Sequence, residues 1–305
     1  MDITDPDTVE KCRAFVERRL ESSDRLWALV CNAGINGSAL PDEWNTVDDF
    51  VRTMDVNFFG HVRTIHAFRH LMDQEKGGRI IVMCSILGHQ NAPFATTYTA
   101  SKHAIVGYAE SLRLEYSHSA LRIITVCPGF FQTNITDSAK IRQTYESRWR
   151  SLPAAVKREY FVNHRYATYF SRRIGMGHDD ASDGSGFNGS NVVSVEGDRG
   201  DKFVDHNNNV IIGKSSKQSG RISDELPEFI VQHLASISKT MSVLCGLNDV
   251  QQVVDAYEHA ILARYPKSTY WVGLDSIFIR FLTCLSADAQ QIINRVLRAT
   301  SKDPL

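Results

Sequence analysis

Short apolar runs alternate with amphipathic stretches along the first half of the chain. Three runs are rich in β-branched side chains, as buried parallel strands are, and they cover residues 26–31, 79–84 and 121–127. Three longer stretches carry apolar side chains at the period of an amphipathic helix, and they cover residues 7–20, 48–71 and 98–116. This alternation predicts an α/β fold with a doubly wound parallel sheet.

The second half of the chain has a different pattern. Residues 140–169 are helical in pattern and rich in aromatic side chains, namely Tyr145, Trp149, Tyr160, Phe161, Tyr166 and Tyr169. In residues 171–223, Gly, Ser, Asn and Asp replace most apolar residues. Such a segment cannot bury enough surface to offset its ordering entropy, so we expect a flexible insertion there. Helical patterns return at residues 225–244 and 248–264.

Composition narrows the possible functions. The 305 residues are 43% hydrophobic, which is enough for one large core, and a net charge of −1 favours no nucleic-acid partner. The six cysteines form no C-x-x-C pair, and we interpret them as small core residues in a reducing compartment. His66 and His70 have the i,i+4 spacing of metal ligands, but no third ligand is suggested nearby, so we interpret them as part of a solvated helix face and predict no metal site.

The stretch from Ser85 to Lys102 carries the candidate chemistry. Tyr98 and Lys102 are four residues apart on a predicted helix, so their side chains share a face. A neighbouring ammonium favours the phenolate form of a tyrosine, which suits a phenol for general acid/base work. Ser85, at the end of a predicted strand, can hydrogen-bond the same substrate oxygen. Taken alone, the Tyr98 and Lys102 pair also fits a solvated tyrosine beside a surface lysine.

Further motifs follow in order and carry a family resemblance. They are Asn32-Ala33-Gly34 after a strand, Asn57 within Asp55-Val56-Asn57, and Pro128-Gly129-Phe130-Phe131-Gln132-Thr133 after another strand. Together with Ser85, Tyr98 and Lys102, this arrangement resembles the short-chain dehydrogenase/reductase family. The resemblance implies a Rossmann-like, N-terminally truncated catalytic domain at residues 1–170 that includes the start of a substrate lid. The insertion at residues 171–223 follows, and residues 224–305 hold the rest of the lid, the last helix and strand, and a C-terminal tail.

The same resemblance assigns roles to individual residues. It implies that Tyr98 is the acid/base, that Lys102 assists it and holds the ribose, that Ser85 orients the substrate, and that Asn57 relays protons through a water. It implies a nicotinamide cofactor, NAD or NADP. The residues expected to hold that cofactor are Asp2, Asn32, Ala33, Gly34, Tyr98, Lys102, Pro128, Gly129 and Thr133.

Two segments resemble one branch of the family. Residues 149–153 and 265–275 are similar to the retinol dehydrogenase and type 2 17β-hydroxysteroid dehydrogenase branch. The resemblance implies a hydrophobic alcohol, steroid or retinoid-like, that is interconverted with its carbonyl. Core packing explains the aromatic residues of the expected lid nearly as well. The alternative function is a catalytically silent remnant that binds an apolar ligand or partner.

Members of the family have a strand, a glycine-rich phosphate turn, a helix and two further strands before the segment that corresponds to Asp2-Ile3-Thr4. We therefore expect that Met1 is an internal methionine of a longer protein and that residues 26–31 form an apolar edge strand. Residues 184–189 match G-x-G-x-x-G, but no strand precedes them and no helix follows, so we predict no phosphate site there.

The location and assembly of the protein are less constrained. The opening residues show no targeting signal, which agrees with an intracellular protein. The sequence leaves open whether the full-length form associates with the endoplasmic-reticulum membrane or is mitochondrial. It equally leaves open contact with a membrane surface, which the apolar residues 276–285 would suit, and homo-oligomer formation.

Overall fold

The computed structural model of the chain describes residues 1–73, 75–133, 137–162, 193–195, 202–204, 210–212, 225–246 and 248–283. Four of its strands form one sheet in the order β1-β2-β3-β7. They are β1 (Ala28–Cys31), β2 (Gly78–Met83), β3 (Leu121–Pro128) and β7 (Thr269–Val272). Every neighbouring pair is parallel, so the four carboxyl ends meet at one edge. The predicted doubly wound parallel sheet is confirmed.

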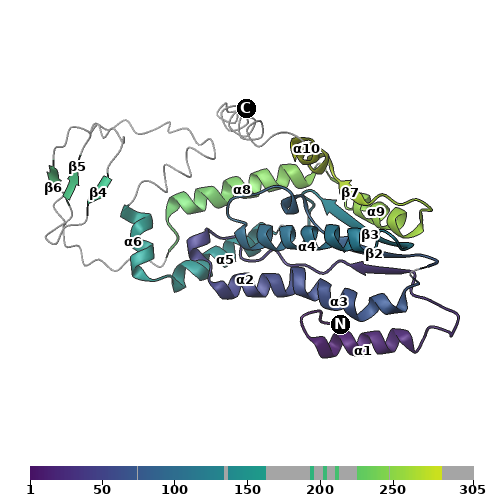
Figure 1. Cartoon of the computed structure of the whole chain (residues 1–305). Coiled ribbons are helices and arrows are strands. Elements are labelled where there is room, and N and C mark those ends of the chain that lie inside the picture. The colour runs from purple at the N-terminus through teal and green to yellow at the C-terminus, as the bar shows by residue number, and fades with distance from the viewer. Residues whose placement is uncertain are drawn as a thin grey trace.

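Helices cover both faces of this sheet (Figure 1). The helices α3 (Gly60–Phe68) and α4 (Thr96–Glu115) pack on one face, and α9 (Gln251–Leu262) packs on the other. Because side chains alternate along a strand, Ile80 and Val82 of β2 join the core on the α4 side, whereas Ile81 joins the core on the α9 side. All three are fully buried. The sheet is therefore the middle layer of a three-layer domain.

The strand β1 lies at an edge of the described sheet. Its Val30 is 40% exposed and the preceding Trp27 is 47% exposed. Only β2 pairs with β1 among the described strands, so one side of its backbone is unpaired. The expected apolar edge strand is present. On its covered side, the helix α1 (Pro6–Glu17) packs against α3 and begins at the N-cap Asp5.

The helix expected over residues 48–71 is interrupted at its centre. It consists of α2 (Val47–Met54), a π-helical turn η2 (Asp55–Phe59), α3, and a closing 3₁₀ turn η3 (Arg69–Leu71). A π turn inserts one extra residue into the helical repeat, and such turns occur frequently at functional sites. The continuous apolar period hides this insertion, which falls on the segment that contains Asn57.

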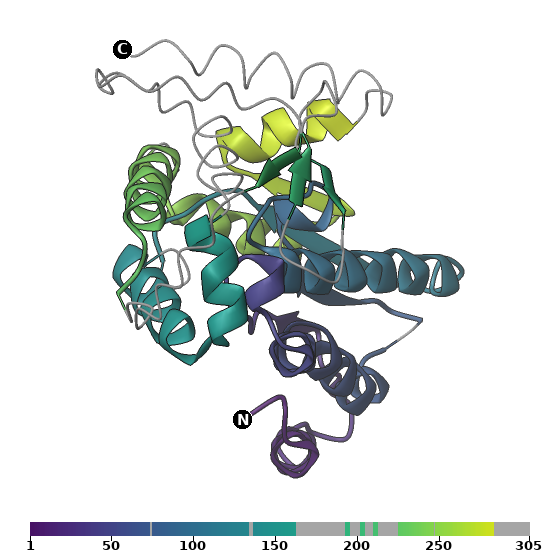
Figure 2. The ribbon, with the colours of Figure 1, turned by 90° about the vertical axis from the view of Figure 1, so that its left-hand side faces the viewer.

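Three further helices form a unit beyond one end of the sheet. They are α5 (Ser138–Ser151), α6 (Ala154–Val162) and α8 (Glu228–Gly246), grouped to one side in Figure 2. Pro153 separates α5 from α6. The unit packs against the short 3₁₀ turn η1 (Asp42–Trp44). It is tied to α2 by Arg148, whose Nη2 lies 2.7 Å from Asp49 Oδ2.

Three aromatic residues of this unit lie in its interior. Tyr145, Trp149 and Tyr160 are each 3% exposed or less, and all three contact the ring of Trp44. The described aromatic side chains therefore follow the core-packing interpretation. Tyr166 and Tyr169 lie outside the described residues.

Within residues 171–223, the structure describes three short strands. They are β4 (Val193–Val195), β5 (Lys202–Val204) and β6 (Val210–Ile212), which form an antiparallel sheet of their own. The fingerprint-like residues 184–189 lie outside the described part. The last described helix is α10 (Leu274–Thr283). Among the described helices, none combines the length and apolar character needed to cross a bilayer.

Candidate active site

Ser85 stands where β2 ends. It is the N-cap of the 3₁₀ turn η4 (Ile86–Gly88), and its hydroxyl accepts a hydrogen bond from Leu87 N at 3.2 Å. The turn η4 packs closely on α4, since a Cβ added at Gly88 would lie 2.7 Å from the carbonyl oxygen of Lys102. Only glycine permits this approach. The close packing brings the end of β2 to the first turns of α4.

Tyr98 and Lys102 lie on these first turns. The Nζ atom of Lys102 is 5.6 Å from the centroid of the Tyr98 ring, so the two side chains share a face as predicted. The same Nζ donates to the carbonyl oxygen of Met83 at 3.1 Å, two residues before Ser85. Tyr98 is half-buried, whereas Ser85 and Lys102 are buried. The structure therefore brings the three residues expected to be catalytic to the carboxyl end of β2.

Lys102 is an unusual lysine because its side chain is 2% exposed. Among the described residues no carboxylate lies within ion-pair distance of it, and its ammonium has one hydrogen-bond acceptor, the Met83 carbonyl. An ammonium carries three donor hydrogens, and burying a charge is costly unless it is paired. Two donors of Lys102 are therefore ready for the hydroxyl groups of a ligand.

Asn57 joins the site from the π turn. It is fully buried, and its amide exchanges two hydrogen bonds with the backbone of Ile35 while donating a third to Ser101 Oγ at 3.0 Å. Ser101 in turn donates to the carbonyl oxygen of Tyr98 at 2.7 Å. A Cβ added at Gly34 would lie 3.4 Å from Asn57 Oδ1 and 3.6 Å from Lys102 Nζ. Asn57 thus links the turn after β1 to the start of α4. The proton relay expected of Asn57 stays a prediction.

His61 is a residue of this network that the sequence did not single out. It lies one turn after Asn57, is 1% exposed, and its Nε2 is 2.7 Å from the carbonyl oxygen of Ala33. Burial lowers the pKa of His61 to about 4; the Ala33 hydrogen bond opposes this effect and the charge of Lys102 adds to it. A neutral imidazole must donate from Nε2 here. In the sequence, the signal that could have indicated His61 is its spacing of four residues from Asn57.

The remaining residues of the expected cofactor site lie along the same edge or beside it. Asn32 is exposed and its Oδ1 accepts from the hydroxyl of Tyr257 at 2.7 Å, a tyrosine on α9 whose pKa is raised by burial. Pro128 ends β3, and Thr133 is exposed five residues later. Asp2 is exposed, and hydrogen bonds from the backbone and hydroxyl of Thr4 lower the pKa of its carboxyl.

Gly129 has a contact that the sequence did not indicate. A Cβ at this position would lie 1.9 Å from Asp275 Oδ1, so the glycine makes room for a carboxylate from the start of α10. Asp275 Oδ2 also accepts from the backbone N–H of Phe130 at 2.6 Å. The cofactor contact expected of Gly129 stays a prediction.

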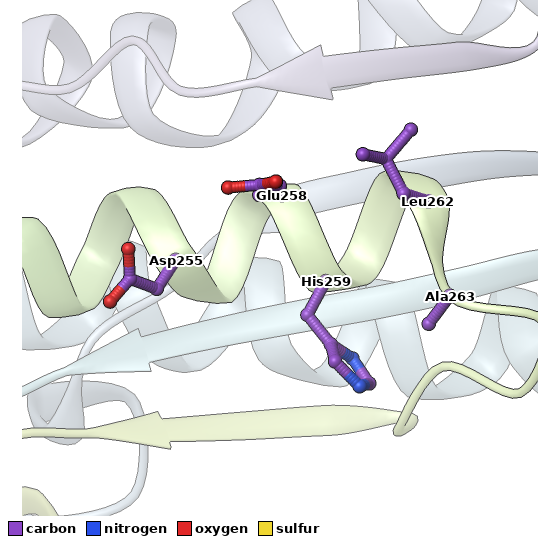
Figure 3. Close-up of a pocket in the computed structure, with 5 residues that line it drawn as sticks. All are labelled: Asp255, Glu258, His259, Leu262 and Ala263. Atoms are coloured by element: carbon purple, nitrogen blue, oxygen red, sulfur yellow. The ribbon is translucent and has the colours of Figure 1, made fainter.

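A separate shallow hollow of about 480 Å³ lies over α9. It is lined by Asp255, Glu258, His259, Leu262 and Ala263, which come from the helix and the residue after it (Figure 3). His259 points from α9 toward β7, and its Nδ1 lies 2.6 Å from the Tyr270 hydroxyl. None of the residues at the carboxyl end of β2 lines this hollow.

Comparison with known proteins gives matches that cover about half of the chain. The chain is 33% identical over 166 residues to a 3beta-hydroxysteroid dehydrogenase of Caenorhabditis elegans, covering 54% of this chain and 42% of that protein. It is 35% identical over 160 residues to human retinol dehydrogenase 5, covering 52% and 49%. A solved short-chain dehydrogenase/reductase from Burkholderia phymatum in complex with NAD matches 47% of this chain and 50% of its own, with 24% identity and a TM-score of 0.40.

The chain thus spans less than half the length of these two curated relatives. The family model described as short chain dehydrogenase matches residues 1–144, the segment that contains Ser85, Tyr98, Lys102 and Asn57. The same motifs that carried the resemblance in the sequence are assembled at one edge of a parallel sheet. Residues 1–144 are therefore similar to short chain dehydrogenases both in their sequence motifs and in the arrangement of those motifs on a parallel sheet.

Proposed function

We propose that this protein is an NAD- or NADP-dependent oxidoreductase that interconverts a hydrophobic alcohol and its carbonyl compound. One observation carries the proposal: Lys102 is a buried ammonium with one neutral acceptor among the described residues, beside the ring of Tyr98. A purely structural lysine in this position would bury a charge with one hydrogen bond and two unused donors. A lysine that holds a ribose and assists a phenol needs both the burial and the spare donors.

The residues present fit a nicotinamide dinucleotide. The spare donors of Lys102 suit ribose hydroxyl groups, and the turn at Gly34 leaves the space in front of Asn57 and Lys102 free of a side chain. Asn32, Ala33 and Gly34 lie at the carboxyl end of β1, where open α/β sheets bind their ligands. When bound, the nicotinamide supplies the chemistry of accepting or giving the hydride.

The protein's own side chains manage the proton and the substrate oxygen. Tyr98 takes the proton from the alcohol hydroxyl during oxidation and returns it during reduction. Ser85 donates a hydrogen bond that holds the same oxygen. Lys102 stabilises negative charge that develops on the phenol, because its ammonium lies beside the ring in a site with little water. Asn57 holds the turn after β1 against α4, and we assign it the relay of protons to Lys102.

The names of the relatives support the proposed substrate class. The two curated relatives are named for retinol and for a 3β-hydroxysteroid, both of which are hydrophobic alcohols. The described aromatic residues of the lid pack against Trp44 inside their own unit, so they support the lid and do not themselves define the substrate. We therefore propose a retinoid or steroid-like alcohol.

The test measures cofactor turnover and cofactor binding separately. The wild-type chain is expected to bind NADH or NADPH, to reduce NAD or NADP with all-trans-retinol or a 3β-hydroxysteroid, and to give the carbonyl product. Tyr98→Phe removes the proton carrier and is expected to lower the turnover number by about a hundredfold or more, with cofactor binding retained. Tyr116→Phe is the matched control, because this half-buried tyrosine ends the same helix about 27 Å away.

Two results would contradict the proposal. One is a folded wild-type chain that binds neither reduced cofactor, which would favour the silent remnant. The other is turnover that Tyr98→Phe leaves unchanged, which would place the proton transfer elsewhere.

A further inference from the structure

The turn after β3 is held by two side chains from the far end of the sequence. Phe130 follows Gly129 in this turn, and both polar groups of its backbone are occupied. Its N–H donates to Asp275 Oδ2 at 2.6 Å, and its carbonyl oxygen accepts from Asn248 Nδ2 at 2.9 Å. The two side chains come from 145 and 118 residues further along the chain. Two residues outside the segment that the family model matches, residues 1–144, therefore hold the backbone of a residue inside it.

The two side chains also hold each other. Asn248 Nδ2 donates to Asp275 Oδ1 at 3.0 Å, and Asn248 Oδ1 accepts from the backbone N–H of Leu274 at 3.0 Å. Every polar atom of the Asn248 amide is thus engaged with the turn after β3 or with the start of α10. We call Asn248, Asp275 and the Phe130 backbone the clasp.

The geometry of the surrounding glycines shows how tightly the clasp is built. A Cβ at Gly129 would lie 1.9 Å from Asp275 Oδ1, and a Cβ at Gly273 would lie 2.8 Å from the same oxygen. Gly273 has a positive φ of 97°, a conformation that L side chains rarely adopt. Ser276, which is fully buried, adds a hydrogen bond from its hydroxyl to the Cys127 carbonyl at 2.8 Å. Hydrogen bonds therefore hold the start of α10 against the end of β3.

We infer that Asn248 and Asp275 are positioning residues for the nicotinamide end of the cofactor site. The inference rests on the proposed function, in which the turn that begins at Pro128 and Gly129 receives the nicotinamide. The clasp sets the direction of the Phe130 peptide unit, and a displaced peptide unit would move the turn relative to Tyr98. Hydrogen bonds to a carboxylate are stronger than neutral ones, so Asp275 contributes most to this placement.

The test uses Asp275→Asn, which keeps the side-chain volume but replaces one acceptor oxygen with a donor. Two quantities are measured: hydrogen–deuterium exchange of the Phe130 amide in the ligand-free protein, and the dissociation constants of NADH and ADP-ribose. Exchange at Phe130 and the NADH dissociation constant are each expected to rise about tenfold, the usual effect of losing one charge-assisted hydrogen bond. ADP-ribose lacks the nicotinamide, so its dissociation constant is expected to stay within twofold of the wild-type value.

A control makes the result specific. The matched control is Asp255→Asn, an exposed carboxylate on α9 that hydrogen-bonds to Gln251 and not to the turn. It is expected to change neither quantity.

Three outcomes overturn the inference while the wild type still binds NADH. They are Phe130 exchange that Asp275→Asn leaves unchanged, faster exchange with unchanged NADH affinity, and equal losses of NADH and ADP-ribose affinity. The last would indicate general destabilisation. If the wild-type chain binds neither NADH nor ADP-ribose, the proposed function is refuted and the inference falls with it. The wild-type measurement alone distinguishes this case from the three outcomes above.

Discussion

The buried imidazole of His61 makes the stability of this fold depend on pH. Burial lowers the pKa of His61 to about 4, against an ordinary value of about 6.5 in an unfolded chain. At pH values between these two pKa values, His61 is protonated in the unfolded state but not in the folded state. The free energy of unfolding therefore falls as the pH falls. Linkage gives a loss of about 2 kcal/mol between pH 7.5 and pH 5, and about 3 kcal/mol by pH 4.

His61→Gln isolates this effect. Glutamine can still donate to the Ala33 carbonyl but does not titrate, so the variant is expected to lose about 2 kcal/mol less than the wild type between pH 7.5 and pH 5. Urea unfolding at several pH values measures both free energies. His66→Gln is the matched control, because His66 is an exposed histidine on the same helix. Parallel curves for wild type and His61→Gln would refute the assignment of the pH dependence to this side chain.

Three further substitutions test the packing around the site, all by urea unfolding at neutral pH. Asp49→Asn removes the negative charge that pairs with Arg148, so we expect a loss of about 3 kcal/mol, whereas the exposed Asp48→Asn should lose under about 0.5 kcal/mol. Gly129→Ala drives a methyl group into Asp275 and should destabilise by about 2 kcal/mol, with a neutral result excluding the close contact. Trp149→Ala empties the aromatic core of the lid unit and should cost about 4 kcal/mol; a loss below about 1 kcal/mol would contradict its burial.

The parallel sheet could be predicted because its strands are buried on one or both faces and its helices have a regular period. The strands β2 and β3 begin and end within one residue of the predicted limits. The strand β1 lies at the edge of the described sheet, as expected from the comparison with the family's strand order, although its composition alone resembles that of the central strands. The start of the first helix at Asp5 follows from backbone chemistry that is visible in the sequence, whereas the helical stretch expected over residues 140–169 is divided at Pro153.

Residues that act through long-range contacts could not be predicted in the same way. Asp275 lies 145 residues after Phe130, and nothing in the local pattern of either residue indicates a partner. His61 is similar, because a histidine on a helix is more often solvated than buried, and its partner carbonyl belongs to a turn 28 residues earlier. Sequence motifs identify residues whose side chains carry chemistry. They do not identify those that hold the backbone beneath it.

The π turn around Asn57 connects residues that hold the backbone with a residue that the sequence motifs identified. An α-helix places the side chains at positions i and i+4 on one face, and a π turn adds a residue, which rotates everything after it by about 100° relative to everything before it. In this chain, the rotation lets α2 carry Asp49 to the lid unit while α3 carries His61 to Ala33. Asn57 lies at the change of direction, where its amide reaches Ile35 and Ser101 at once. A regular helix would turn His61 by about 100° relative to Asp49, and so the irregularity that the apolar period concealed sets the relative direction of the two side chains that support the lid unit and the turn after β1.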